Sequence, residues 1–136
     1  MKPVSADIEI ELSAYLNPSE SVEKVVSAIK YIVPNSTPRR KGDAVAAEAD
    51  NIGALQRIYE QIRSRQTLAV VRSRLLRNLS GEETFILLNK QAAFAGAIVT
   101  CDDDNESPLG AIKLTFRSSK MMAVIDWIAP HLDREQ

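Results

Sequence analysis

Arginine residues are the densest candidates for chemistry in this sequence. Between positions 57 and 77 there are six arginines and a single acidic residue, Glu60. If this segment is helical, such a density of guanidinium groups can hold a phosphate backbone, and RNA is then a candidate partner. The alternative is a solvated helix surface, because arginine has a good helix propensity. The candidate binding residues of this segment are Arg63, Arg65, Arg72, Arg74 and Arg77.

Arg72 differs from the other arginines because it falls inside an apolar stripe. Leu68, Leu75 and Leu79 recur on the side of the predicted helix that also contains Arg72. A guanidinium group at that position needs carboxylate or carbonyl partners, or its side chain must extend past the apolar surface to reach water. We therefore expect Arg72 to have a structural role first.

A second group of candidates is the polar trio Asn89, Lys90 and Gln91. It follows an apolar segment that predicts a strand, and it precedes two alanines. Consecutive polar side chains at the end of a strand can line a binding site. They can equally cap the short turn that follows, and the sequence leaves both interpretations open.

Other reactive side chains are few. The single histidine, His131, has no evident catalytic partner, and the single cysteine, Cys101, precedes carboxylates that oppose formation of a thiolate. The acidic run 102–106 could attract a divalent cation, but it lacks the glycine and the distal glutamate of a calcium loop. The sequence contains no glycine-rich phosphate loop, nucleophile elbow or paired-histidine zinc motif. We expect no enzyme activity, no cofactor and no metal.

Length and composition describe an ordinary globular chain. Its 136 residues predict one domain, 1–136, and its single cysteine excludes disulfide scaffolds and zinc fingers. The 17 basic and 18 acidic residues give a net charge of −1, which hides a segregation of arginines in the middle of the chain from acids elsewhere. No apolar stretch approaches the roughly 20 residues that span a bilayer. We expect no membrane association and a cytoplasmic location.

Hydrophobic periodicity predicts the elements that must position these side chains. Strict alternation over 6–16 predicts a half-buried strand, and further strands are predicted over 43–50, 83–89, 97–101 and 111–117. Apolar spacings of three and four predict helices over 17–33, 52–62 and 68–79, with a break between Ser64 and Thr67, and a last helix over 121–129.

The segments 34–43 and 102–108 are predicted loops, because they are polar and rich in helix and strand breakers. The two strands that flank the second loop are expected to pair antiparallel across it. The predicted fold class is α+β, with a single antiparallel sheet of about five strands and helices packed mainly on one face.

Three motifs resemble those of a small archaeal protein family that is labelled RNA-binding. They are L-N-K-Q-A-A-F-A-G at 88–96, S-P-L-G-A-I at 107–112 and I-D-W-I-A-P at 125–130. The resemblance extends over essentially the whole chain, including the R-x-x-L step that begins at Arg72. It implies an antiparallel sheet flanked by helices, a shape related to the ribosomal protein that carries 5S rRNA and to RNA-recognition-motif domains, and a homodimer. It implies no established function.

The chemistry of the first strand argues against RNA on the sheet. Asp7, Glu9 and Glu11 alternate with its apolar residues and would repel phosphates. Lys113, Thr115 and Arg117 alternate in the same way on the last strand, and we expect them to pair across the sheet with this acidic row. Phe85 and Phe116 can fall on either face, and neither aromatic signature of an RNA-recognition motif is present.

Three functional hypotheses follow, of which an enzyme with a site near Asn89, Lys90 and Gln91 ranks last. The first is a non-enzymatic, dimeric interaction or scaffold module with an RNA-binding-like fold. The alternative is an RNA-binding protein that uses the helical face Arg63–Arg77 rather than the sheet. Arg63, Arg65, Arg72, Arg74, Arg77, Asn89, Lys90 and Gln91 are the residues that would contact RNA or a protein partner.

Overall fold

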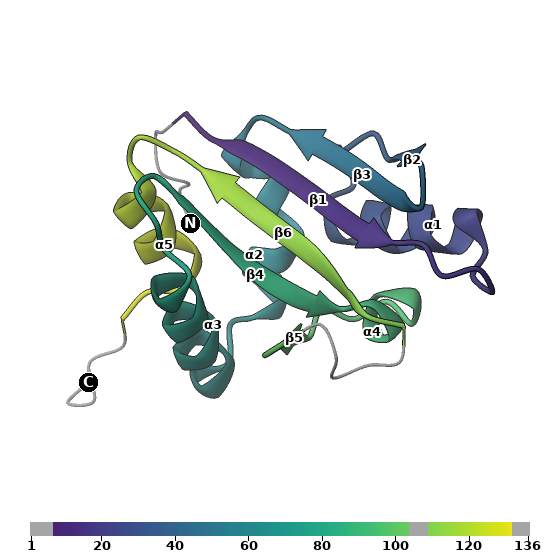
Figure 1. Ribbon diagram of the computed structural model, residues 1–136. Coiled ribbons are helices and arrows are strands. Elements are labelled where there is room, and N and C mark those ends of the chain that lie inside the picture. Colours follow the sequence, from purple (N-terminus) through teal and green to yellow (C-terminus); the bar gives the residue numbers. More distant parts are fainter. Residues whose placement is uncertain (1–6, 104–108, 132–136) are drawn as a thin grey trace.

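The computed structural model describes residues 7–103 and 109–131 and contains one six-stranded antiparallel sheet (Figure 1). The strand order is β2-β3-β1-β6-β4-β5. The strands are β1 (Glu9–Tyr15), β2 (Arg39–Lys41), β3 (Ala44–Ala49), β4 (Glu83–Asn89), β5 (Thr100–Cys101) and β6 (Ala111–Arg117). The helices are α1 (Val22–Ile32), the short 3-10 helix η1 (Ile52–Leu55), α2 (Gln56–Gln61), α3 (Arg65–Arg77), α4 (Lys90–Phe94) and α5 (Met121–Ile128).

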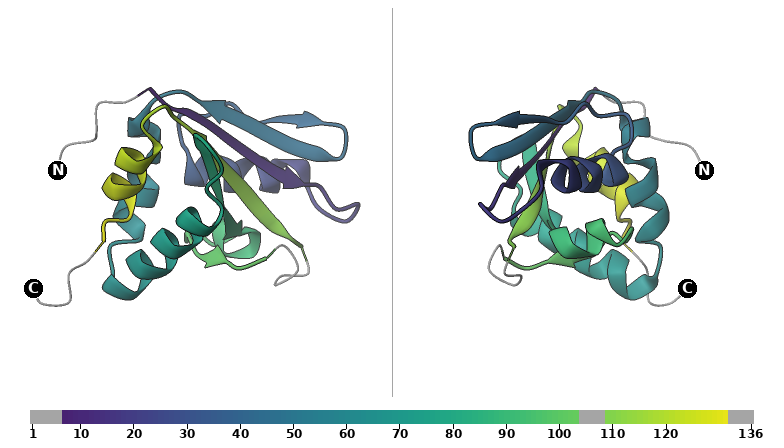
Figure 2. Two further views of the ribbon diagram at one scale, coloured as in Figure 1. Left: turned by 60° about the vertical axis from the view of Figure 1, so that its left-hand side comes forward. Right: turned by 90° about the vertical axis from the view of Figure 1, so that its right-hand side faces the viewer.

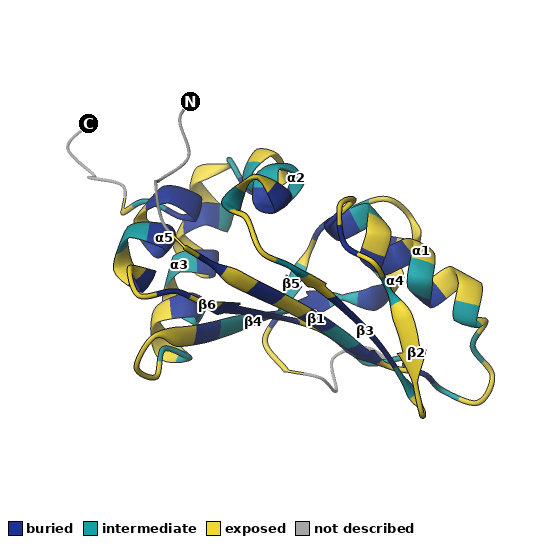
Figure 3. Ribbon diagram, turned by 90° about the horizontal axis from the view of Figure 1, so that it is seen from above, coloured by how far each residue is buried: buried dark blue, intermediate teal, exposed yellow. Residues whose placement is uncertain are grey.

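The helices lie on one side of the sheet, and in the described residues no helix covers the other side (Figure 3). Figure 2 shows α1 next to α4, while α3 and α5 lie together at the other end of the sheet. Strand β1 alternates as predicted, with Ile10, Leu12 and Ala14 buried under the helices. These side chains belong to one continuous apolar cluster that joins the sheet to the helices. The predicted α+β class with helices mainly on one face is confirmed.

The strands predicted over 83–89 and 111–117 are observed with those bounds. The predicted break between the two helices is observed, but it falls at 62–64 rather than between Ser64 and Thr67, because Ser64 caps α3 and Arg65 already belongs to the helix. The start of α1 was predicted too early, because Ser21 rather than Asn17 caps the helix by accepting from the backbone of Lys24. Residues 17–20 instead form a turn in which the Asn17 backbone N–H donates to Glu20 at 3.0 Å. Glu20 therefore reaches back to Asn17 as predicted, but outside the helix.

The expected pairing of 97–101 with 111–117 is wrong. Strand β5 has only two residues and pairs with β4, and β6 crosses to a place between β1 and β4. The central position lets β6 bury Ile112, Leu114 and Phe116 on one face along its whole length. Burying this apolar row against two neighbours is more favourable than forming a hairpin with a very short strand.

Strand β2 lies inside the segment 34–43, which was predicted to be a loop. It forms a hairpin with β3 through a two-residue turn, in which Gly42 has a φ of 61°. A positive φ at the first central position is what a type II′ turn requires. The Gly42-Asp43 pair was the signal for this hairpin, but the flanking residues Arg39, Arg40 and Lys41 are polar and gave no strand pattern.

The described helices include none that combines the length and the apolar character needed to cross a membrane.

Candidate nucleic-acid interface

The arginines at the C-terminal end of α3 form ion pairs within the molecule. Arg74 donates from Nη1 to the Thr100 hydroxyl at 2.6 Å, and its Nε lies 3.8 Å from Asp102 Oδ1. Arg77 donates from Nη2 to the same carboxylate oxygen at 2.9 Å. Both guanidinium groups therefore face β5 and the residues that follow it, and Asp102 offsets part of their charge.

Arg63 and Arg72 hold the C-terminal end of α5. Arg72 Nη1 donates to Asp126 Oδ1 at 2.8 Å and to the Ala129 carbonyl at 3.0 Å. Arg63 donates to the Ile128 carbonyl, and its guanidinium carbon lies 3.7 Å from the centre of the Tyr59 ring. The last carbonyls of a helix lack partners within the helix, and here two arginines supply them. Arg72 thus has the carboxylate and carbonyl partners that its place in the apolar stripe requires.

Arg65 is the exception among the five candidates. It is exposed in the first turn of α3, and within residues 7–103 and 109–131 it has no hydrogen bond or ion pair. Successive helical residues are rotated by about 100°, so Arg72 and Arg74 point to opposite flanks of α3, about 160° apart. The structure does not bring the five arginines onto a single surface.

The polar trio after β4 divides into a cap and a buried cation. Asn89 accepts from the Ala92 backbone N–H at 2.9 Å and so caps the short helix α4. Lys90 has 0% of its side chain exposed and donates from Nζ to the Tyr15 carbonyl at 2.7 Å and to Glu20 Oε1 at 3.0 Å. Gln91 is exposed on α4. Asn89 thus has the capping role that was one of the two open interpretations.

The Lys90–Glu20 pair joins two distant parts of the chain. It links the junction of β4 and α4 to the segment between β1 and α1. Burial raises the pKa of Glu20, but hydrogen bonds from Asn17 and contact with the Lys90 ammonium outweigh it and hold that pKa below its ordinary value. Because Lys90 also binds the Tyr15 carbonyl, the pair fixes the end of β1.

The uncovered side of the sheet is here called the open face. It carries Glu9, Glu11, Ser13 and Tyr15 from β1; Lys113, Thr115 and Arg117 from β6; Glu83, Phe85 and Leu87 from β4; Ala44, Ala46 and Glu48 from β3; and Arg39 and Lys41 from β2. The strand register places acids at one end and aromatic and basic residues at the other. The two ends therefore differ in chemistry.

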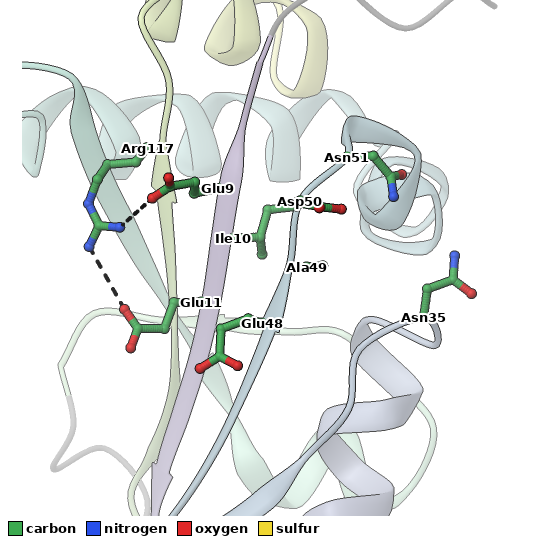
Figure 4. Close-up of a pocket in the computed structure, with 9 residues that line it drawn as sticks. All are labelled: Glu9, Ile10, Glu11, Asn35, Glu48, Ala49, Asp50, Asn51 and Arg117. Atoms are coloured by element: carbon green, nitrogen blue, oxygen red, sulfur yellow. Dashed lines mark hydrogen bonds and ion pairs between the residues drawn. The ribbon is translucent and has the colours of Figure 1, made fainter.

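The acidic end surrounds Arg117. This guanidinium lies 2.7 Å from Glu83, 3.1 Å from Glu9 and 3.9 Å from Glu11, and the bond to Glu83 is the main reason that its pKa is raised. The predicted pairing with the acidic row is confirmed for Arg117. It is wrong for Lys113, which lies opposite Ser13 and places its ammonium over the Phe85 ring. Next to Arg117 lies a hollow of about 530 Å³, whose lining also includes Asp50, the residue that follows β3 (Figure 4). One guanidinium among three carboxylates leaves this end negative.

The aromatic end, defined by Tyr15, Phe85 and Lys113, lies across three neighbouring strands. Tyr15 is 52% exposed at the end of β1. The Lys113 ammonium lies 4.5 Å from the centre of the Phe85 ring, and register places Ser13 and Leu87 on either side of Lys113. Phe85 therefore falls on the open face, whereas Phe116 is buried in the core. Sequence reasoning missed this group because its members are far apart in the chain and Tyr15 shares its face of β1 with the acids Glu9 and Glu11.

The remaining sequence candidates offer no further site. Among the described residues, no three His, Cys, Asp or Glu side chains are arranged to hold a metal ion. The acidic run 102–106 lies partly outside the described residues. Cys101 is buried, and His131 is exposed.

The family and the relatives of this chain are found by comparison with known proteins, and the two relatives named here are from archaea. A family model described as RNA binding matches residues 9–118. A UPF0201 protein of Sulfurisphaera tokodaii is 36% identical over 127 residues, which cover 90% of this chain and 85% of the relative. A UPF0201 protein of Thermococcus onnurineus is 36% identical over 126 residues, covering 90% and 91% of the two chains.

Two solved structures share the fold. An uncharacterized UPF0201 protein superposes with a TM-score of 0.77 at 34% identity, covering 90% of this chain and 94% of the other. The UPF0201 protein from Methanococcus jannaschii superposes with a TM-score of 0.76 at 25% identity, covering 94% and 97%.

Proposed function

This chain belongs to the RNA-binding family and is similar to archaeal UPF0201 proteins, and from this premise we propose an RNA-binding function. We propose that the chain is a cytoplasmic, non-enzymatic protein that binds RNA on the open face of its sheet. The observation that carries this proposal is the contact of the Lys113 ammonium with the Phe85 ring. Both side chains lie on the face of the sheet that no described helix covers. Proteins that bind RNA through a sheet combine aromatic rings for the bases with cations for the phosphates.

The arginine surface of α3 is the alternative site for RNA. Arg65 is exposed, and Arg77 is exposed enough for a phosphate to compete with Asp102, since an exposed ion pair contributes only about 0–1 kcal/mol. Arg63 and Arg72 are less available, because they already bind the carbonyls at the end of α5. The α3 surface can therefore contribute two cations, neither of which contacts an aromatic ring of the described residues.

Fluorescence anisotropy with single-stranded RNA distinguishes the two surfaces. We expect Lys113→Gln to weaken binding several-fold, whereas Arg65→Gln and Arg77→Gln have little effect. Lys30→Gln, an exposed lysine on α1, is the matched control for loss of one positive charge. Binding that is lost in the α3 variants and kept in Lys113→Gln would place RNA on α3. No binding above the non-specific level at low salt would overturn the RNA function itself.

A dimeric interaction or scaffold module is the second candidate, and one observation favours it. Strand β2 pairs only with Ala44–Ala46, so within the described residues the rest of β3 up to Ala49 has no strand on its outer side. An uncovered strand edge is a template for a strand from another chain. Light scattering without RNA tests this candidate. A monomer at all concentrations would count against it.

A further inference from the structure

We infer that the aromatic end of the open face binds a short unpaired segment of RNA, and that the acidic end limits how far along the sheet the strand extends. This inference rests on the proposed function and specifies its ligand. Three features of the described residues support it: the spacing of the two rings, the lysines beside them and the carboxylates around Arg117.

The two rings are far enough apart to take two bases of one strand that are not neighbours. Phe85 lies opposite Thr115, which lies opposite Glu11, and Glu11 is four residues from Tyr15 along β1. With a rise of about 3.4 Å per residue and about 4.8 Å between strands, the two positions are roughly 16 Å apart. Ser13, Lys113 and Leu87 fill the row between them. A surface of this extent suits about two or three stacked bases, as on other RNA-binding sheets.

Two lysines, Lys41 and Lys113, lie on either side of the Tyr15 position. Register places Lys41 of β2 and Tyr15 of β1 on either side of Ala44, and Lys113 lies on the next strand, β6. Neither lysine forms an ion pair among the described residues. Lys41 also lies close enough to Glu48 to help lower the pKa of that carboxyl, so Lys113 is the more available of the two ammonium groups. Ammonium groups near an exposed ring complement a strand whose phosphates alternate with bases.

The ammonium on the Phe85 ring occupies the position of a base. A cation on an exposed aromatic ring is held weakly, whereas a base stacks on such a ring more strongly. An incoming base can therefore displace the Lys113 ammonium, which is then free to pair with the adjacent phosphate. Paired bases are already stacked within a helix and cannot offer their faces in this way, so the site selects unpaired RNA.

The carboxylates around Arg117 limit how far the bound RNA strand extends along the sheet. Beyond Phe85 on β4 comes Glu83, and Glu9 lies across Arg117 from it. Glu11 lies across Thr115 from Phe85, at the border of the two ends. A phosphate placed there meets an excess of negative charge, since Arg117 is already shared by these acids. A strand that stacks on Tyr15 and Phe85 is thus disfavoured from continuing over this end.

The test uses the full chain and a fluorescein-labelled ten-nucleotide oligouridylate, compared with the same strand in a duplex with oligoadenylate. We expect Tyr15→Leu and Phe85→Leu each to weaken single-strand binding about tenfold, with no change in duplex binding. Lys113→Gln should reduce the salt slope of binding by about 1, whereas Phe85→Leu should leave the slope unchanged. The double variant Glu9→Gln, Glu11→Gln should bind the ten-nucleotide strand more tightly and a three-nucleotide strand as before.

Several outcomes would overturn the inference. Single-strand binding that survives both Leu variants but is lost in Arg65→Gln with Arg77→Gln refutes it and leaves the RNA function standing. Equal affinity for single strand and duplex also refutes it. The absence of any RNA binding removes the proposed function as well. A dimer that Phe85→Leu dissociates would assign the face to a second copy of the chain. Urea unfolding of each variant confirms that the fold is retained.

Discussion

The α3 surface and the open face of the sheet both carry cationic side chains, but they use them differently. On α3, Arg72, Arg74 and Arg77 bind Asp126, Thr100 and Asp102 and so attach the helix to α5 and to the β5 segment. On the open face, Lys113 and Lys41 form no ion pair within the described part of the chain, although Lys41 acts at longer range on Glu48. The denser cluster of cations in the sequence is thus the less available one.

This difference teaches that the number of basic residues in a segment does not predict its charge in the folded protein. What matters is whether a carboxylate or a carbonyl from another element lies within reach. Asp126 follows its partner Arg72 by 54 positions, and Asp102 follows its partner Arg77 by 25 positions. Only the fold brings them to the helix.

The largest expected effect concerns a cation that is wholly internal. Lys90→Met should destabilise the protein by about 3–5 kcal/mol, because it leaves the Glu20 carboxylate buried without its ammonium partner. Urea unfolding followed by circular dichroism measures this loss. The double variant Lys90→Met, Glu20→Leu should recover much of it. A single variant as stable as the native chain would show that the pair is not structural.

Arg72→Ala should have the next largest effect. It removes hydrogen bonds to Asp126 and to the Ala129 carbonyl, and we expect a loss of about 1–3 kcal/mol. Arg65→Ala, on the same helix but without a described partner, is the matched control. It should unfold at the same urea concentration as the native protein. If both variants were equally stable, the distinction between structural and available arginines on α3 would fail.

A smaller effect depends on pH. The pKa of Glu20 is lowered from about 4.5 in the folded protein, so below that value the unfolded chain binds the proton more readily. The stability that this carboxylate contributes is therefore complete above pH 4.5 and is lost as the pH falls through the lower, folded pKa. Glu20→Gln should flatten the fall in melting temperature between pH 5 and pH 3. Glu82→Gln, on an exposed side chain, should leave it unchanged.

The smallest expected effect is at the acidic end of the open face. Arg117→Gln leaves Glu9, Glu11 and Glu83 without their shared cation and should lower the melting temperature slightly at low salt. Because these groups are exposed, the difference should vanish at high salt, where charges are screened. A salt-independent loss would indicate that Arg117 contributes by packing rather than by charge.

The sequence predicted those parts of the fold that depend on local periodicity. Alternation placed β1, a short apolar run placed β4, and the three-and-four spacing placed α1 and α3, because each pattern is local to its own element. Strand order was not predictable in this way. The position of β6 between β1 and β4 depends on how the apolar faces of several elements pack into one core. The residue pattern within a single element does not contain this information.

The candidate site was predictable only in part. The cross-strand partners of Arg117 followed from alternation, and the need of Arg72 for polar partners followed from its place in an apolar stripe. Lys90 carried no sign that it would be fully buried, since its partners come from β1 and the turn after it. The grouping of Tyr15 with Lys113 and Phe85 required the register of three strands.

The central position of β6 also has a consequence for synthesis. While a ribosome makes this chain, β1 to β5 all emerge before residue 111, yet β1 and β4 cannot join until β6 lies between them. Until then the nascent chain has two separate groups of strands, each with an unpaired edge. The two groups can join into one sheet only after β6 has been made, so chains released before that point should aggregate or be degraded.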